Sequence, residues 1–187
     1  AWGMANQYLS EELDAPAVGG TVVVRGADAR HAVTVSRLAV GETVQVANGA
    51  GVVVSGRVTR VASAEFELTA ESVVTVQRPQ PAVTLVQALA KGGRDEMAVQ
   101  AATELGVDRI IPWAASRSIV RWDGDRAAKG RQRWAGIVRE ATKQSARPWL
   151  PTVEPVMTTK ALAALADGRP GELLVVVLDP LAEHSLA

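Results

Sequence analysis

The chain has 187 residues, of which 48% are hydrophobic, enough to bury a core in one domain or in two small ones. It contains no uncharged apolar run of about eighteen residues and no signal-peptide pattern, so neither a membrane span nor export is supported, and a cytoplasmic protein is expected. The lack of cysteine excludes disulfides and thiolate zinc sites, and two isolated histidines argue against a histidine-based metal site. No metal is therefore expected.

Positive charge is concentrated in one part of the chain, although the net charge is zero. Residues 117–147 contain nine Lys or Arg against three Asp or Glu, a net charge of +6, whereas residues 1–76 have a net charge of −3. Such a run is usually a solvated helix face. Here Trp122, Trp134 and Trp149 lie inside or beside it, and arginine and aromatic planes both stack on unpaired bases, which favours RNA binding. Trp134 also falls on an apolar helical stripe and is expected in the core.

Residues 1–76 are predicted to be mostly β structure. Val-rich runs predict strands at 21–25, 43–47, 52–61 and 66–76. The helical spacing of His31, Val35 and Leu38 predicts one short helix at about 28–38. The Asn-Gly pair at 48–49 predicts a tight hairpin over 48–51. Closing these short strands into a small closed or half-closed barrel would protect their edges.

The stretch Arg78-Pro79-Gln80-Pro81 breaks the β pattern and predicts a domain boundary, with one domain at 1–78 and a second at 82–187. A buried strand is predicted at 83–89, a helix at 94–105 and another strand at 107–112. The apolar stripe of that helix is predicted to contain Met97, Ala98, Ala101, Ala102 and Leu105, with Gly106 as its C-terminal cap.

The remaining elements continue the alternation of strand and helix. A long helix is predicted at about 126–146, a weaker helix at about 158–166, and a central parallel strand at 173–178 from the run LLVVVL. The long helix is expected to bury one face, formed by Trp134, Ile137, Val138, Ala141 and Ser145. This order of elements indicates an α/β domain with a parallel sheet and right-handed crossovers.

General sequence motifs do not identify a chemistry, because no GxGxxG, GxxxxGK[ST], GxSxG or HExxH occurs. Polar residues at unexpected places are Lys91 after a strand, Glu104 at a helix end, and Glu140, Gln144 and Arg147 in a row. Each also has a structural explanation. Lys91 can be a solvated loop residue, Glu104 can pair with Arg109, and the last three can interact along one helix face.

Two blocks of sequence resemble one enzyme family. The first is Gln87-Ala88-Leu89-Ala90-Lys91, Glu96, and the run QAATELGV at 100–107. The second is Pro112, Arg117-Ser118, Arg133-Trp134, Glu140-Ala141, Gln144-Ser145, Arg147 and Pro151. Together they resemble the RsmE-type 16S ribosomal RNA uridine-N3 methyltransferases of the SPOUT superfamily. Residues 31–37 and the hairpin at 48–51 resemble that family's PUA-like RNA-binding barrel, although Ser36 stands where the family has leucine.

The resemblance implies a fold and a cofactor. A PUA-like barrel would precede a SPOUT α/β domain, with a deep trefoil knot in the intact protein. Family members continue into a Gly-Pro-Glu-Gly-Gly segment and a Leu-Gly…Ile-Leu-Arg segment, which tie the knot and supply most of the backbone that holds S-adenosylmethionine. Neither segment occurs here, so the cofactor site is expected after Ala187, the natural protein is expected to be longer, and this chain alone is expected to be inactive.

The implied reaction is methyl transfer to N3 of a uridine in 16S ribosomal RNA of the small subunit, by a homodimer. This nitrogen is a poor nucleophile, so the enzyme must present a flipped or unpaired base and stabilise charge on O2 and O4. The candidate catalytic residues are Arg117, Glu104 and Glu140, with the identity of the base left open. The candidate RNA-binding residues are Arg37, Lys91, Arg133, Lys143, Gln144 and Arg147, of which Arg147 is also a candidate for holding the developing oxyanion.

Two other functions compete with this interpretation. One is a non-catalytic RNA-binding protein that uses the barrel and the basic helix and never binds S-adenosylmethionine. The other is an α/β enzyme acting on a nucleotide or metabolite, which the Val-rich strands permit but no phosphate-binding loop supports.

Overall fold

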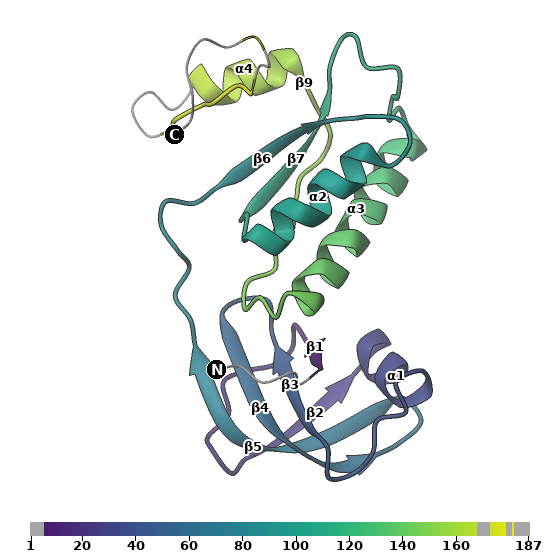
Figure 1. The fold of residues 1–187 in the computed structure, drawn as a ribbon, viewed down its shortest axis with the longest axis vertical. Coiled ribbons are helices and arrows are strands. Elements are labelled where there is room, and N and C mark those ends of the chain that lie inside the picture. The colour runs from purple at the N-terminus through teal and green to yellow at the C-terminus, as the bar shows by residue number, and fades with distance from the viewer. Residues whose placement is uncertain (1–5, 168–172, 179–180, 182–187) are drawn as a thin grey trace.

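The computed structural model describes residues 6–167, 173–178 and 181, and it contains two separate β-sheets (Figure 1). The first is five-stranded, in the order β1-β3-β4-β5-β2. Its elements are β1 Gln7–Leu9, β2 Thr21–Arg25, helix α1 Ala27–Thr34, β3 Thr43–Ala47, β4 Val52–Val61 and β5 Glu65–Thr75. Only β1 pairs in parallel, with β3, and the other strand pairs are antiparallel.

The first sheet curls around its own core as a half-barrel. Alternate residues point inward, so Val24, Val46, Val54, Phe66 and Leu68 are fully buried in one cluster. A Cβ at Gly56 would lie 2.0 Å from the Thr69 carbonyl oxygen, so only glycine permits the close approach of β4 and β5 at the register shift there. The predicted barrel is confirmed, and so are its four Val-rich strands.

The second sheet is parallel, as predicted, and has the order β6-β7-β8 with β9 also paired to β7. Its elements are β6 Thr84–Ala88, α2 Arg94–Leu105, β7 Arg109–Ala114, α3 Asp125–Gln144, β8 Thr152–Val153, β9 Met157–Thr158 and α4 Thr159–Asp167. Helices α2 and α3 pack together, and their core with the sheet contains Val99, Ile110, Trp134 and Val138. The predicted burial of Trp134 is therefore confirmed.

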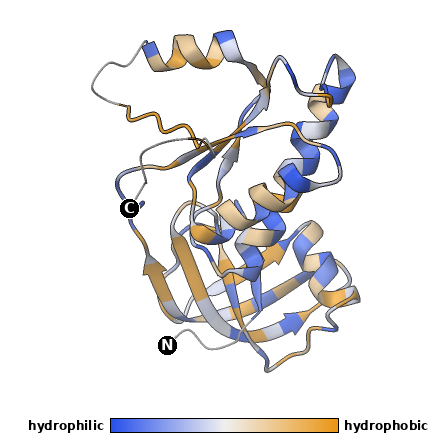
Figure 2. Ribbon diagram, turned by 45° about the horizontal axis from the view of Figure 1, so that its top comes forward, coloured by the Kyte–Doolittle hydropathy of each residue, from blue (hydrophilic) through white to orange (hydrophobic). Residues whose placement is uncertain are grey.

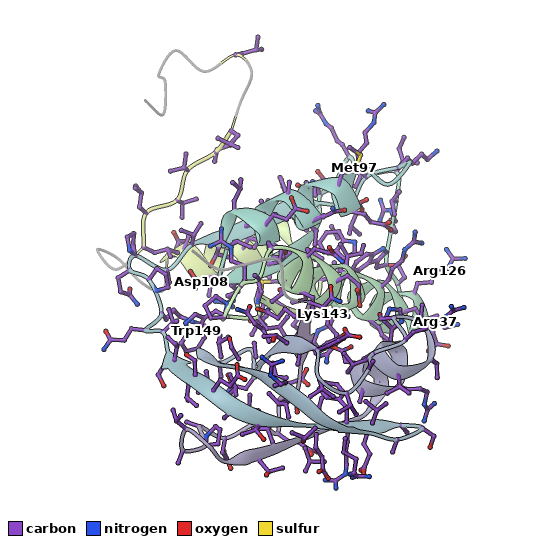
Figure 3. The ribbon with its side chains drawn as sticks, turned by 60° about the horizontal axis from the view of Figure 1, so that its bottom comes forward. Arg37, Met97, Asp108, Arg126, Lys143 and Trp149 are labelled. Atoms are coloured by element: carbon purple, nitrogen blue, oxygen red, sulfur yellow. The ribbon has the colours of Figure 1, made fainter. Side chains whose placement is uncertain are left out.

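The predicted apolar stripe of α2 faces the core only in part, because Ala102 packs against the core whereas Met97, Ala101 and Leu105 are exposed. Met97 and Leu105 are 71% and 83% exposed, and the buried residues are Asp95, Val99 and Thr103. The polar residues tolerate burial because they are satisfied locally. The Thr103 hydroxyl donates to the Val99 carbonyl, and the Asp95 carboxylate accepts from the backbone N–H of Ala90. The helix therefore turns an apolar side outward (Figure 3).

The predicted strand at 173–178 is also not formed. All six residues are exposed, from 44% at Leu173 to 87% at Leu174, and they make no strand pairing with the described parts of the chain. Figure 2 shows the segment in orange as a stretch without a strand arrow. Apolar β-branched composition favours a strand only where a neighbouring strand supplies hydrogen-bond partners, and none does so here.

Candidate nucleic-acid interface

Two loops lie at the carboxyl end of the parallel sheet, where α/β proteins usually bind ligands. Residues 89–93 follow β6, and residues 115–124 follow β7, which runs parallel to β6. Helices α2 and α3 both begin at this end, in the upper right of Figure 1. Their first backbone N–H groups and their dipoles make the end electropositive before any side chain is counted.

Side chains add to this positive charge. Six exposed cations lie on the two loops and on the first turns of the helices: Lys91, Arg94, Arg117, Arg121, Arg126 and Lys129. Within the described residues, none of the six forms a side-chain ion pair. The exposed acids beside them are Asp123 and Asp125. We call this set of six cations the basic end.

Two glycines set the backbone conformation of the loop after β6, which carries Lys91. Gly92 and Gly93 both have left-handed backbones, with φ of 71° and 73°, which side-chain-bearing residues rarely adopt. The buried Asp95 carboxylate accepts hydrogen bonds from Ala90 N at 3.1 Å and from Glu96 N at 2.9 Å, and so fastens the loop to the start of α2. The Lys91 side chain therefore projects from a defined turn.

Two tryptophans make internal contacts, Trp122 in the loop of the basic end and Trp149 beyond the opposite end of α3. Trp122 packs edge-on against Trp134, with ring centroids 5.0 Å apart, and a Cβ at Gly130 would lie only 2.4 Å from its ring. The Trp149 indole donates to the Val76 carbonyl at 3.0 Å and lies 4.6 Å from the Arg78 guanidinium carbon. Both rings are half-buried, so these contacts do not support the predicted stacking of RNA bases on them.

Arg117 and Lys91 are the predicted site residues that lie at the basic end, and both are exposed. Arg133 lies one turn beyond it on α3 and pairs with Glu96 of α2 at 2.7 Å. Arg37 is exposed in the first sheet region, directly after α1, with a left-handed φ of 54°.

Two of the predicted RNA-binding cations are committed to internal contacts. The Lys143 side chain is 12% exposed, and its ammonium contacts Asp28 at 3.3 Å and Glu140 at 2.7 Å. The Arg147 Nε donates to the Glu104 carbonyl oxygen at 3.0 Å, and its guanidinium fills the space where Gly106 lacks a Cβ. The arginine thus caps the C-terminus of α2, which stabilises the helix dipole.

The candidate catalytic carboxylates lie away from Arg117. Glu104 is the last residue but one of α2, ten residues after the helix begins at the basic end, a rise of about 15 Å. Glu140 lies in the last two turns of α3. Both are exposed, as is the neighbouring Gln144, and Glu104 accepts from Gln100 at 2.9 Å. One chain therefore does not bring the three predicted catalytic residues together, and their roles stay predictions.

The ion pairs that residue spacing suggested for Glu104 and Glu140 also differ from those in the structure. Arg109 pairs with Glu154 at 2.9 Å, not with Glu104. Glu140 pairs with Lys143 rather than with Arg147. The partner of Arg109 could be named only after the strands were placed, because Glu154 lies 45 residues away, whereas Glu140 and Lys143 are a local pair three residues apart on one helix.

Sequence reasoning did not single out Arg94 or the buried Asp28. Arg94 had a usable signal, since it opens a helix directly after two glycines at the end of a strand. Asp28 had none, because its cationic partners, Arg139 and Lys143, are more than a hundred residues away. Among the described residues, no group of three metal-ligating side chains is found, and no helix is long and apolar enough to cross a membrane.

Comparisons with known proteins match both parts of the chain. A family model described as RNA methyltransferase domain matches residues 77–187. Ribosomal RNA small subunit methyltransferase E of Mycobacterium tuberculosis (strain CDC 1551 / Oshkosh) is 37% identical over 147 residues, and that of Bacillus subtilis (strain 168) is 30% identical over 143. These alignments cover 79% and 76% of this chain, and the chain spans 56% of the length of either relative.

Solved structures show the same architecture. Ribosomal RNA small subunit methyltransferase E from Neisseria gonorrhoeae, bound to S-adenosyl methionine, has a TM-score of 0.74 and 31% identity over 89% of this chain and 67% of that one. A methyltransferase from Legionella pneumophila, in complex with the bound cofactor SAM, has a TM-score of 0.71 and 26% identity over 82% of this chain and 63% of that one. The PUA-like barrel and SPOUT region that the sequence predicted are therefore shown. Because the family model matches more than half of its residues, the chain belongs to the RNA methyltransferase domain family, and within it to the RsmE type of the SPOUT superfamily.

Proposed function

We propose that this chain is part of an S-adenosylmethionine-dependent enzyme that methylates N3 of a uridine in 16S ribosomal RNA of the small subunit. The observation that carries the proposal is the basic end, because its six cations lie on the loops and helix starts at the carboxyl end of the parallel sheet and form no ion pair within the described residues. The relatives named above act on small-subunit ribosomal RNA and the two solved neighbours bind S-adenosylmethionine, which supports the substrate and the methyl donor.

Arg117 is proposed to face the reacting base. S-adenosylmethionine, when bound, supplies the methyl group. Uridine N3 must lose its imide proton to an acceptor for the N–CH3 bond to form, and the negative charge left by that proton is shared with O2 and O4 until methyl transfer neutralises it. An unpaired guanidinium at the end of the sheet can stabilise that charge, and Arg117 is exposed there without an ion-pair partner in the described chain.

The other cations of the basic end are proposed to hold phosphates around a flipped uridine. Lysines and arginines next to two helix N-termini suit this role, since phosphate contacts position an RNA without reading its sequence. Arg37 extends the proposed contact surface to the barrel. Lys143 and Arg147 are not included, because their charged groups already bind Asp28 and Glu104.

The apolar segment 173–178, which could have formed a wall beside the sheet, is exposed and unpaired. No described residue is therefore proposed as a cofactor ligand, and a site formed with chain beyond Ala187 stays a prediction.

A homodimer is part of the proposal. Met97, Ala101 and Leu105 recur every four residues on α2 and are all exposed, giving one apolar side without a partner in the described chain. Burying this side against a second copy would remove it from water. Leu105→Glu should shift the sedimentation coefficient from that of a dimer to that of a monomer, whereas Gln100→Glu on the same helix should leave it unchanged. A dimer that survives Leu105→Glu would contradict this interface.

The proposed activity is tested by methyl transfer. The protein is incubated with labelled S-adenosylmethionine and small ribosomal subunits that lack the modification, and the modified nucleoside is identified by mass spectrometry. We expect N3-methyluridine. A different methylated nucleoside would overturn the proposed position, and RNA binding without any transfer would overturn the enzyme in favour of the non-catalytic RNA-binding protein.

A further inference from the structure

Two cations on the second half of α3, and a third directly after the helix, face the rest of the molecule instead of solvent. Arg139 and Lys143 are spaced by four residues, so they lie on one side of α3, whereas Arg147 follows the helix end after the left-handed Ala146. The side chains of Arg139 and Lys143 are 28% and 12% exposed. Arg147 binds the end of α2, whereas the other two reach across to the barrel.

The two cations that reach the barrel meet on one buried carboxylate. Asp28 of α1 has a 7% exposed side chain, lies 3.3 Å from the Lys143 ammonium and 3.5 Å from the Arg139 guanidinium, and accepts a hydrogen bond from Leu9 N at 2.9 Å. Figure 3 shows Lys143 between α3 and the barrel. Arg139 also donates to the Leu9 carbonyl oxygen at 3.3 Å and pairs with Glu11. We call these contacts the Asp28 lock.

The charges of the lock are mutually compensated. Burial disfavours the charged form of Arg139, but its hydrogen bond to Glu11 and the charge of Asp28 outweigh this effect and raise its pKa. A buried carboxylate that loses its cations is strongly unfavourable, so the lock resists being opened to solvent.

A second contact joins the same two regions at a different place. The hairpin tip at 48–51 pairs with residues 148–150, through hydrogen bonds from Gly51 N to the Pro148 carbonyl at 3.0 Å and from Leu150 N to the Gly49 carbonyl at 2.9 Å. A Cβ at Gly51 would lie 2.7 Å from the Trp149 ring, so this contact is close. A single contact would let the barrel rotate about it relative to α3, whereas two contacts at separate places prevent that rotation.

We propose that Asp28 is a positioning residue, which locks the barrel to α3 so that Arg37 and the basic end keep a fixed spacing. The fixed geometry itself follows from the contacts above. Its use, presenting the two cationic regions to one RNA, rests on the proposed function. Without the lock, the barrel would be held by the hairpin contact, by the hydrogen bond from Gln7 Nε2 to the Arg147 carbonyl and by the packing of Leu150 on the barrel, and it would swing about these contacts.

The geometry is tested by distance measurement between spin labels. Because the chain contains no cysteine, Ser63→Cys on the barrel and Gln132→Cys on α3 label two exposed sites only. Labelled protein is diluted with unlabelled protein, so that only distances within one chain contribute. We expect a single narrow distribution, which Asp28→Asn broadens at least twofold while the circular dichroism spectrum stays unchanged.

Two further variants keep the test decisive. Lys143→Met breaks the lock from α3 and leaves the barrel sequence intact, so it should broaden the distribution even where Asp28→Asn weakens the barrel itself. Glu12→Gln removes the neighbouring exposed acid, which forms no ion pair within the described residues, and it should leave the width unchanged. A narrow distribution in both Asp28→Asn and Lys143→Met would overturn the proposal.

RNA binding supplies the second readout. Loosening two linked binding regions lowers their effective concentration for each other, so Asp28→Asn should weaken binding to small ribosomal subunits about tenfold. An unchanged affinity together with a broadened distribution would overturn the positioning role. A parent protein that binds no RNA would overturn the proposed function instead, and the distance measurement would still decide the lock.

Discussion

The two halves of α3 have similar cations and opposite surroundings. At the start of the helix, Arg126 and Lys129 are exposed and pair with no described acid, whereas near its end Lys143 is buried against Asp28. The difference comes from what the fold places opposite each half, since the first half lies at the end of the sheet and the second half lies against the barrel. A run of positive charge in a sequence therefore mixes residues available to a ligand with residues that hold the protein together.

The largest expected effect is a loss of stability when a cation in the second half of α3 is removed. Lys143→Ala is expected to lower the free energy of unfolding by about 2 to 3 kcal/mol, because it leaves Asp28 with Arg139 as its remaining cation. Lys129→Ala on the same helix should change it by less than about 0.5 kcal/mol, since that side chain is exposed and unpaired in the described chain. Urea unfolding measures both. Equal effects would remove the distinction between the two halves.

The exposed cations should instead control activity. Arg117→Ala is expected to reduce methyl transfer about a hundredfold, as loss of a group that stabilises transition-state charge does, with the melting temperature unchanged. Lys160→Ala, which also removes an exposed cation, should retain the parent rate. Full transfer by Arg117→Ala would show that the charge on the base is stabilised by another group.

The salt dependence of RNA binding should distinguish the exposed cations from the internally paired ones by a smaller effect. Lys91→Ala and Arg126→Ala should each reduce the slope of log affinity for RNA against log salt concentration by about one, because each removes one phosphate contact. Glu140→Gln, which changes an acid beside the buried Lys143, should leave the slope unchanged. Filter binding at several salt concentrations provides the slopes. An unchanged slope in both basic-end variants would contradict phosphate binding there.

The smallest expected effect is the pKa shift of Tyr8, which lies in the barrel core next to the Asp28 lock. Burial raises the pKa of Tyr8 above its ordinary value of 10.0. The neutral phenol is thus favoured in the folded state, and its contribution to stability is present below pH 10 and is lost as pH rises toward the folded pKa. Since Tyr8 is the only tyrosine, ultraviolet absorbance of tyrosinate reports this titration directly. A midpoint at or below 10 in the folded protein would contradict it.

Much of the fold could be predicted because it depends on local patterns. The Val-rich strands, the parallel order of β6 and β7, and the burial of Trp134 follow from periodicity, while β1 was missed because three residues carry no period. The predicted burial of the α2 stripe was wrong at its exposed positions, because the sequence shows which positions are apolar but not which side of the helix meets α3. The prediction of a strand at 173–178 was wrong because a strand requires a neighbouring strand, which the described chain does not provide.

Less of the site could be predicted. Lys91 and Arg117 were found through the family resemblance, but nothing in the sequence indicated that Lys143 and Arg147 would be used internally. Their partners, Asp28 and the carbonyl of Glu104, are 115 and 43 residues away, and helical spacing reveals only neighbours within about a turn. The division into domains at 78 and 82 stays a prediction.

The contact of Arg147 with the end of α2 also bears on how the protein opens. Its guanidinium rests on Gly106, whose φ of 95° permits the cap, and it holds the Glu104 carbonyl. The last turns of α2 and α3 cannot fray independently without breaking this contact. Their amide protons should therefore exchange with solvent together, as one cooperative unit, although the two helix ends are about forty residues apart in sequence.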